Sequence, residues 1–132
     1  MHTDRDWLNQ VTEKIIGCAF KVGNKLGCGF LEKCYRNAMA LELRKLGLEV
    51  KPEHPISVLY DGVVIGEYFA DLLVENTVVV ELKAGKGLDD VHQAQCINYL
   101  AATGKPICLL IHFGKRVQIK RIVRPGFDLE SQ

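Results

Sequence analysis

Residues 71–83 read DLLVENTVVVELK, and this stretch decides both the fold and the candidate site. Its second half is apolar at nearly every position, which predicts a central strand that is covered on both faces. Glu81 and Lys83 interrupt the apolar run and, two residues apart on a strand, point to one face. Burying a carboxylate and an ammonium there is costly unless they are paired or coordinate a metal. The strand is therefore expected to contribute to a functional site as well as to the hydrophobic core.

The register of the preceding strand decides whether Asp71 joins them. A two-residue turn at 75–76 would place Asp71 opposite Val80, and Glu81 would then face away. A three-residue loop at 75–77, or a bulge, would place Asp71 opposite Glu81 on the same face. We predict this second arrangement.

Such a pair of carboxylates indicates a metal site. Two adjacent carboxylates repel each other, and a divalent cation removes that penalty. Oxygen ligands of this kind suit Mg²⁺ or Mn²⁺. The alternative is structural: Glu81 and Lys83 would form a buried ion pair, and Asp71 would be a turn residue.

Helix and strand patterns extend outward from this stretch. Asp6 is the expected N-cap of a first amphipathic helix, and Gly47 follows a second one. Asp61-Gly62 predicts a two-residue hairpin turn. The expected elements are helices at 6–25 and 30–46, strands at 54–60, 63–74 and 77–83, a helix at 89–102, and strands at 107–112 and 117–122. The apolar stripe of the second helix is expected to comprise Leu31, Cys34, Tyr35, Ala38, Leu41 and Leu46.

Length and composition predict one ordinary globular domain. The chain has 132 residues, of which 48% are hydrophobic and 25% charged. We expect a single domain at 1–124 and a loosely held C-terminal tail at 125–132. No apolar run approaches the roughly 18 residues that cross a bilayer, and the first ten residues have no apolar signal-peptide core. A cytoplasmic protein without a membrane partner is expected.

The cysteines give weak support to a metal or disulfide framework. They are odd in number and show no C-x-x-C spacing. We expect most of them to be reduced and buried, with an iron–sulfur cluster on four of them as the less favoured alternative. The five are Cys18, Cys28, Cys34, Cys96 and Cys108.

The charge is nearly balanced overall but uneven along the chain. The formal net charge is +1, so there is no global electrostatic case for a nucleic-acid partner. The last strand region, however, carries only basic charges, and such a stripe could neutralise phosphates. A solvated edge strand protected by charge is an equally good interpretation. The stripe comprises Lys115, Arg116, Lys120, Arg121 and Arg124.

Two pairs of polar residues have helical spacing. Glu32 and Tyr35 are three residues apart, and Gln95 and Tyr99 are four apart, so each pair is expected to share a helix face. Taken alone, each pair is also explained as ordinary surface or boundary residues.

These motifs together resemble a known family. Ala70-Asp71 followed by Glu81-Leu-Lys83 resembles the signature of the PD-(D/E)XK nuclease superfamily, with Ala70 in place of the motif proline. Residues 29–35, GFLEKCY, resemble the GxxExxY motif of a group of small bacterial proteins in that superfamily. Residues 95–99, QCINY, are similar to the QxxxY motif of its RecB-like branch. The resemblance spans about residues 8 to 124.

The resemblance implies a PD-(D/E)XK restriction-endonuclease-like α/β core, in which helices flank a central mixed sheet in the order α-α-β-β-β-α-β-β. It also implies metal-dependent hydrolysis of phosphodiester bonds. Asp71, Glu81 and the backbone carbonyl of Leu82 would hold Mg²⁺ or Mn²⁺, and Lys83 would position the attacking water or neutralise developing charge. Glu32 would act near the metal, directly or through water, and Gln95 and Tyr99 would orient the substrate phosphate or Lys83.

Two classes of function therefore compete. The first is an active nuclease, with DNA favoured over RNA as its substrate and Lys115, Arg116, Lys120 and Arg121 as candidate phosphate contacts. The second is a catalytically silent nucleic-acid binder or oligomeric scaffold on the same fold, because fold alone does not fix function. A homo-oligomer or partner protein is compatible with either, through apolar residues of the first helix such as Trp7.

Overall fold

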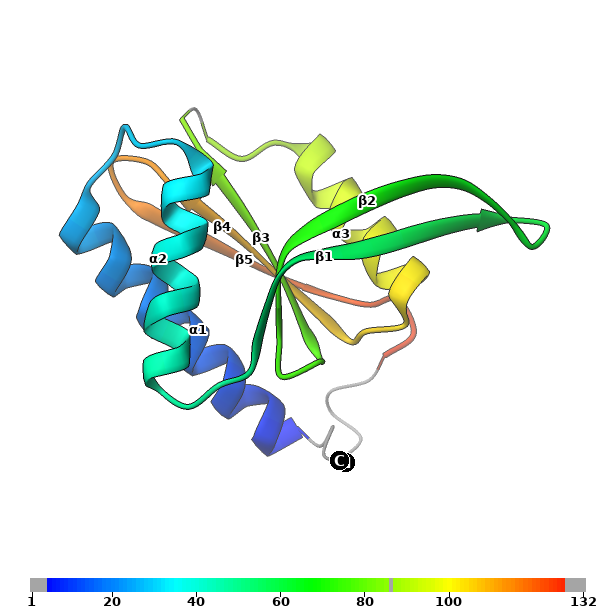
Figure 1. Ribbon diagram of the computed structural model, residues 1–132, viewed down its shortest axis with the longest axis horizontal. Coiled ribbons are helices and arrows are strands. Elements are labelled where there is room, and N and C mark those ends of the chain that lie inside the picture. Colours follow the sequence, from blue (N-terminus) through cyan, green and yellow to red (C-terminus); the bar gives the residue numbers. More distant parts are fainter. Residues whose placement is uncertain (1–4, 86, 128–132) are drawn as a thin grey trace.

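The computed structural model describes residues 5–85 and 87–127 and contains one five-stranded mixed sheet between helices (Figure 1). The strand order in space, β1-β2-β3-β4-β5, follows the order along the chain. All neighbours are antiparallel except β3 and β4, which are parallel. The elements are α1 (Arg5–Leu26), α2 (Glu32–Lys45), β1 (Val50–Tyr60), β2 (Val63–Val74), β3 (Val78–Ala84), α3 (Asp90–Thr103), β4 (Ile107–Phe113) and β5 (Val117–Val123). The predicted fold class and element order are confirmed.

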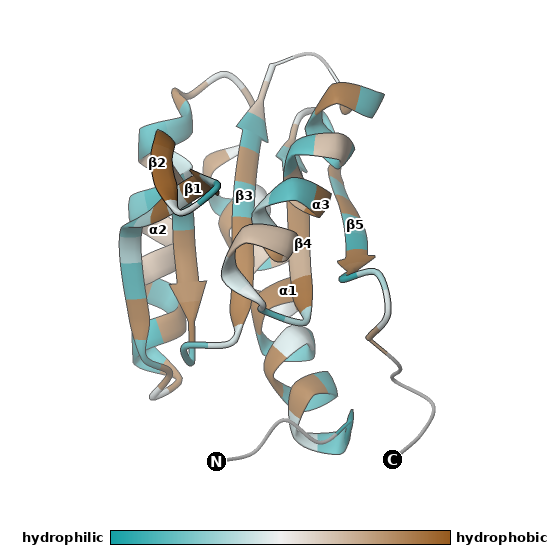
Figure 2. Cartoon of the chain, turned by 90° about the vertical axis from the view of Figure 1, so that its right-hand side faces the viewer, coloured by the Kyte–Doolittle hydropathy of each residue, from teal (hydrophilic) through white to brown (hydrophobic). Residues whose placement is uncertain are grey.

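The sheet separates two hydrophobic cores. Helices α1 and α2 cover one face, and α3, which joins the parallel strands β3 and β4, covers the other (Figure 1). Strands β3 and β4 are buried over almost their whole length, and Figure 2 shows β3 changing from hydrophobic to hydrophilic toward its C-terminal end. The prediction that β3 is central and covered on both faces is confirmed. The candidate residues lie at the hydrophilic end of this central strand.

Helix α1 follows its predicted pattern, with Leu8, Ile15 and Val22 among its buried residues. Trp7 is half-buried and packs against the same core. The prediction of an N-cap at Asp6 is wrong, because the helix already includes Arg5. Asp6 instead lies in the first turn, where its negative charge complements the helix dipole.

Helix α2 buries a stripe that matches the predicted one only in part: Tyr35 and Ala38 pack against the core as predicted, but the other members are exposed. Its core contacts come from Tyr35, Met39 and Leu43, which are spaced by four residues and are fully buried. Leu31 and Leu41, which the sequence assigned to the core, are 76% and 57% exposed. The apolar residues of this helix surround most of its circumference, so periodicity alone could not select the buried line. Cys34 and Leu46, which the sequence also assigned to the core, are exposed as well.

The hairpin of β1 and β2 forms as predicted, but β1 begins earlier. Asp61 and Gly62 have φ angles of 49° and 78° and connect the paired residues Tyr60 and Val63. Positive φ at both central residues is what a tight hairpin turn requires. The strand was expected from residue 54 and begins at Val50, because β1 is an edge strand, in which prolines are tolerated.

The predicted register between β2 and β3 is confirmed. Leu72 pairs with Val80 and Val74 pairs with Val78, so the connecting loop has the three residues 75–77. At the next position along this register Asp71 lies opposite Glu81. The ladder between the two strands ends there, after three residue pairs.

Beyond that point the hairpin turns away from the sheet and projects past α3 (Figure 1). Ala70 and Leu73 both pack in the core beneath α3, although strict alternation would put residues three apart on opposite faces. Glu53 lies between the residues paired with Ala70 and Leu72 and has a φ of 51°. Strand β2 therefore changes the face that it presents at Asp71, beside the opening between β2 and β3.

The remaining expectations concern the tail, the cysteines and the membrane. Phe127, in the predicted tail, is half-buried against the core of α1 and α2, and residues 128–132 lie outside the described residues. Cys18 is buried on one face of the sheet, and Cys96 and Cys108 on the other, whereas Cys28 and Cys34 are exposed. All five are free thiols. Among the described helices, none is long and apolar enough to cross a membrane.

Candidate active site

Asp71 and Glu81 face each other where β2 and β3 separate. The Leu82 N–H donates to Asp71 Oδ2 at 2.8 Å, and the Asp71 N–H donates to Glu81 Oε1 at 3.4 Å. Each carboxylate thus accepts a backbone hydrogen bond from the other strand, in the position where a regular ladder would offer a carbonyl. The two acids are fixed by the backbone itself.

Burial controls the protonation of this pair. It is the largest influence on both carboxylates and raises the pKa of each, to about 9 for Glu81. The charge of Asp71 raises the pKa of Glu81 further, because a second negative charge nearby disfavours ionisation. The hydrogen bond from Leu82 acts in the opposite sense on Asp71. Near neutral pH the pair alone therefore favours holding a proton, and a cation would be needed to ionise both acids.

Lys83 lies two residues beyond Glu81 and is half-buried. Its positive charge lowers the pKa of both Asp71 and Glu81, so it lies within electrostatic reach of both. No ion pair joins Glu81 to Lys83 in the described part of the chain, and Asp71 belongs to β2 rather than to a turn. The structural alternative, a buried Glu81–Lys83 ion pair with Asp71 in a turn, is therefore wrong.

Helix α2 brings two further charges to the opening. Glu32, its first residue, accepts a hydrogen bond from the Ala84 N–H at 3.3 Å, and its charge raises the pKa of Asp71. Arg36, one turn later, places Nη1 3.8 Å from Asp71 Oδ1 and Nη2 3.7 Å from Glu53 Oε1. Its Nε is buried and has no hydrogen-bond partner among the described residues. Helix α2 therefore places one acidic and one basic side chain near Asp71.

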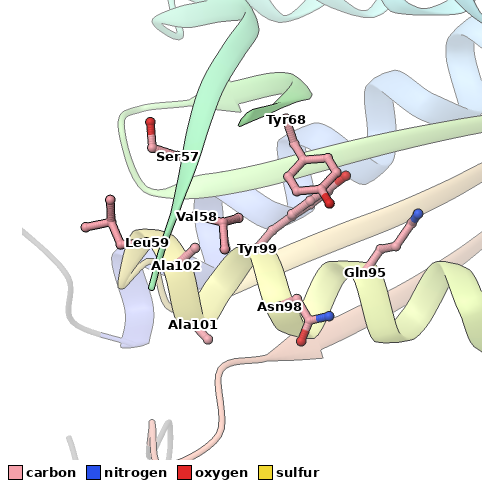
Figure 3. Close-up of a pocket in the computed structure, with 9 residues that line it drawn as sticks. All are labelled: Ser57, Val58, Leu59, Tyr68, Gln95, Asn98, Tyr99, Ala101 and Ala102. Carbon is pink, nitrogen blue, oxygen red and sulfur yellow. The ribbon is translucent and has the colours of Figure 1, made fainter. Parts of the chain in front are cut away.

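Helix α3 contributes the other predicted pair. Gln95 and Tyr99 line one groove together, as their spacing predicted, and Tyr68 of β2 lies against Tyr99 with ring centroids 5.9 Å apart (Figure 3). Burial, followed by the charge of Glu81, raises the pKa of Tyr99 to about 12, so its hydroxyl stays protonated. Cys96, next to Gln95, is buried, and it raises the pKa of Glu81 further.

Tyr35 has a structural role instead of sharing a polar face with Glu32. It is fully buried, and its ring stacks on Phe113 with centroids 4.4 Å apart. Its hydroxyl donates to the Gly27 carbonyl at 2.6 Å, which ties α2 to the loop after α1. The sequence assigned Tyr35 both to the apolar stripe of α2 and to a polar pair with Glu32; the first assignment is confirmed and the second is wrong, because Tyr35 belongs to the buried line of α2.

The basic residues of the last strand do not form one patch. Lys115 and Arg116 lie in the turn between β4 and β5. Lys120 and Arg121 are neighbours on β5 and therefore point to opposite faces. Arg121 donates to Asn9 Oδ1 of α1 at 2.8 Å.

The donor set of the opening fits a hard divalent cation. Asp71 and Glu81 supply carboxylate oxygens side by side, and Mg²⁺ is commonly bound by one or two carboxylates while keeping several waters. In residues 5–85 and 87–127, however, no group of three or more His, Cys, Asp or Glu side chains is arranged to hold a metal ion. Two carboxylates with carbonyl and water oxygens are therefore the ligands that this part of the chain can offer.

Sequence reasoning missed two residues of this region. Arg36 had a usable signal, because it is four residues after Glu32 and such residues share a helix face. Tyr68 had none, because its approach to α3 depends on the change of face at Asp71. Arg36 lies one helical turn after the predicted Glu32, and Tyr68 lies against the predicted Tyr99.

Comparisons with known proteins agree with this fold. Among solved structures with this fold, SSO0001 has a TM-score of 0.52 and 19% identity over 73% of this chain, which spans 50% of the length of SSO0001. An alkaline exonuclease (LHK-Exo) from Laribacter hongkongensis has a TM-score of 0.52 and 16% identity, with 94% of this chain and 72% of the exonuclease covered. No curated protein sequence matches significantly. A profile of the PD-(D/E)XK nuclease superfamily matches residues 9–122, from the first helix to the last strand, and the chain therefore belongs to that superfamily.

Proposed function

We propose that this protein is a metal-dependent nuclease that hydrolyses phosphodiester bonds in nucleic acid. One observation carries the proposal: the half-buried Asp71 and the buried Glu81 are held side by side by reciprocal backbone hydrogen bonds, and the charge of Asp71 raises the pKa of Glu81. A fold stabilised only by packing gains nothing from such a pair. A bound cation would convert the repulsion into coordination.

The roles follow from position. Asp71, Glu81 and the Leu82 carbonyl are the proposed ligands of Mg²⁺ or Mn²⁺, with Glu32 acting through water. A bound cation of this kind lowers the pKa of a coordinated water and stabilises charge on the phosphoryl oxygens. Lys83 is suited to orient that water or to neutralise developing charge.

Three side chains outside the ligand set complete the proposal. Arg36 carries a half-buried guanidinium beside Asp71, and such a group suits a phosphate oxygen. Gln95 and Tyr99 can donate hydrogen bonds to the substrate. We further propose that residues 29–35 and 95–99 are the GxxExxY and QxxxY motifs of their respective branches, and that DNA is favoured over RNA.

Calorimetric titration with Mn²⁺ tests the metal site. Wild type is compared with Asp71→Asn and Glu81→Gln, and Asp61→Asn serves as the matched control, because Asp61 is an exposed carboxylate of the hairpin turn. Binding should be lost in the first two variants and retained in the control. The same samples are assayed for cleavage of single- and double-stranded DNA and RNA.

The outcomes separate the two classes of function. Metal binding with cleavage, both abolished together, supports the nuclease. A folded wild type that neither binds Mn²⁺ nor cuts any substrate would overturn the proposal. Thermal unfolding of each variant verifies that a lost signal reflects the site and not the fold.

A further inference from the structure

A groove with a volume of about 580 Å³ lies between the projecting hairpin and α3. Tyr68 reaches it from β2, and Gln95, Asn98 and Tyr99 reach it from α3, while Val58 of β1 points toward the helix (Figure 3). Tyr99 belongs both to this groove and to the surroundings of Glu81. Tyr68 is three residues before Asp71 on β2. Through Gln95 and Tyr99, which line it, the groove adjoins the candidate active site.

The lining has an unusual composition for a site next to carboxylates. The described residues that line it include no charged side chain: they are aromatic, aliphatic, or carry a hydroxyl or amide. A phosphate would be poorly held there, because phosphates are bound by cations or backbone N–H groups. A planar heteroaromatic ring would fit, since aromatic side chains offer it a stacking surface and amides pair with its edge.

The exposure of Tyr68 also favours a planar heteroaromatic ring as the ligand. The Tyr68 side chain is 49% exposed even though it sits beside Tyr99. Part of its ring is thus open to solvent at the mouth of the groove. A buried core tyrosine such as Tyr35 offers no such face.

We propose that this groove binds an unpaired nucleobase, which stacks on Tyr68 and is contacted along its edge by Gln95 or Asn98. The inference rests on the proposed nuclease function and adds the substrate class: single-stranded nucleic acid, or a strand end whose terminal pair is open. A base inside a duplex is stacked and paired, so it reaches a pocket only after it is extruded. The neutral groove thus selects the strand form, and the adjoining carboxylates act on the backbone.

Binding of fluorescein-labelled DNA, followed by anisotropy, tests the proposal without requiring cleavage. A short single strand and a hairpin duplex of the same length are titrated in EDTA and in Ca²⁺. Tyr68→Ala should weaken single-strand binding by at least about fivefold, the lower range for loss of one base stack. Tyr68→Phe, which keeps the ring, should bind as wild type does.

Tyr60→Ala is the matched control, because Tyr60 is a more exposed tyrosine of the same hairpin that does not line the groove. It should bind the single strand as wild type does, and neither substitution should weaken duplex binding. If Tyr68→Ala fails to fold, a scan of single abasic sites replaces it: one missing base should weaken binding to the wild type, and an Asn98→Ala variant should reduce that difference.

Failure of this inference is distinguishable from failure of the proposed function. Cleavage of DNA in Mn²⁺, with binding that depends on neither Tyr68 nor any single base, overturns the base pocket and leaves the nuclease intact. Tyr68-dependent binding without cleavage supports the pocket and argues against the nuclease. Absence of single-strand binding by the wild type in both buffers overturns the pocket.

Discussion

Two buried glutamates on opposite sides of the molecule have opposite electrostatic environments. Glu42 on α2 is 7% exposed and Glu81 on β3 is 6% exposed. Glu42 lies 3.0 Å from the Lys21 ammonium, with Lys25 and Lys45 nearby, and the hydrogen bond from Lys21 lowers its pKa. The pKa of Glu81 instead rises to about 9, through burial and the neighbouring Asp71.

The difference separates a structural carboxylate from a functional one. Lys21 and Glu42 connect α1 to α2, and the cations that Glu42 needs are part of the fold. The charge with the largest effect on the pKa of Glu81 is that of an acid, Asp71, so the cation that would stabilise ionised Glu81 must come from outside. Burial alone is therefore uninformative, whereas the sign of the neighbouring charge indicates which acid has a ligand to bind.

Neutralising each glutamate in turn is the most direct test of this distinction. Glu81→Gln should reduce metal-dependent cleavage by more than about a hundredfold, since even indirect partners of metal ligands typically contribute 10- to 100-fold. Glu42→Gln should keep wild-type cleavage. Initial rates on labelled DNA in Mn²⁺ measure both, and equal loss in the two variants would contradict the distinction.

Removal of Arg36 should have the next largest effect. The Arg36 charge lowers the pKa of Asp71, so Arg36→Ala makes that acid harder to ionise. Metal affinity should fall by about tenfold, the lower range for residues that support a ligand. Calorimetry with Mn²⁺ provides the measurement, and Lys33→Ala, an exposed change on the same helix, is the control. Unchanged affinity in Arg36→Ala would remove Arg36 from the site.

The metal-free protein should show the pH dependence of a raised carboxyl pKa. Between the ordinary value of 4.5 and about 9, folded Glu81 binds more protons than the unfolded chain does. Its contribution to the free energy of unfolding is therefore fully present at low pH and falls as pH rises across that range. Glu81→Gln should remove this term and raise the Tm at pH 8 in EDTA by a few degrees. A Tm difference that does not change with pH would contradict it.

The smallest expected effect concerns Glu42 and has the opposite sign. Its lowered pKa contributes stability above 4.5 that is lost as pH falls. Lys21→Met should weaken that contribution only slightly, because the lysine is exposed and Lys25 and Lys45 remain. Chemical denaturation at pH 7 and in acid tests this, and a larger loss in acid than at pH 7 would contradict it.

Much of this arrangement could be predicted from the sequence because it depends on local geometry. The hairpin turn at Asp61-Gly62 requires positive φ, and the apolar run of β3 requires cover on both faces. The register that pairs Asp71 with Glu81 followed from chemistry, since a three-residue loop or a bulge brings the acids together and a two-residue turn does not. The family signature and the site share those residues, so each supported the other.

Apart from element boundaries such as Asp6 and the start of β1, the errors have one physical origin: they depend on which side of an element faces the core. Helix α2 is apolar around most of its surface, so the buried line through Tyr35 and Met39 was set by packing against the sheet. The alternation of β2 fails at Asp71, which brings Tyr68 to α3 and could not be read from period two. The basic residues of β5 look like one stripe in sequence but alternate between faces in space.

The short pairing of β2 with β3 has a consequence for how the molecule opens. Three residue pairs join the hairpin to the sheet at this seam, whereas seven join β3 to β4. Amide hydrogens of the outer hairpin should therefore exchange with solvent by local opening, well before those of the central strands. The Asp71 amide lies on the boundary, because its hydrogen is donated to the Glu81 side chain and not to a backbone carbonyl. The exchange rate of the Asp71 amide hydrogen would therefore report, at a single backbone position, whether the Glu81 side chain accepts its hydrogen bond.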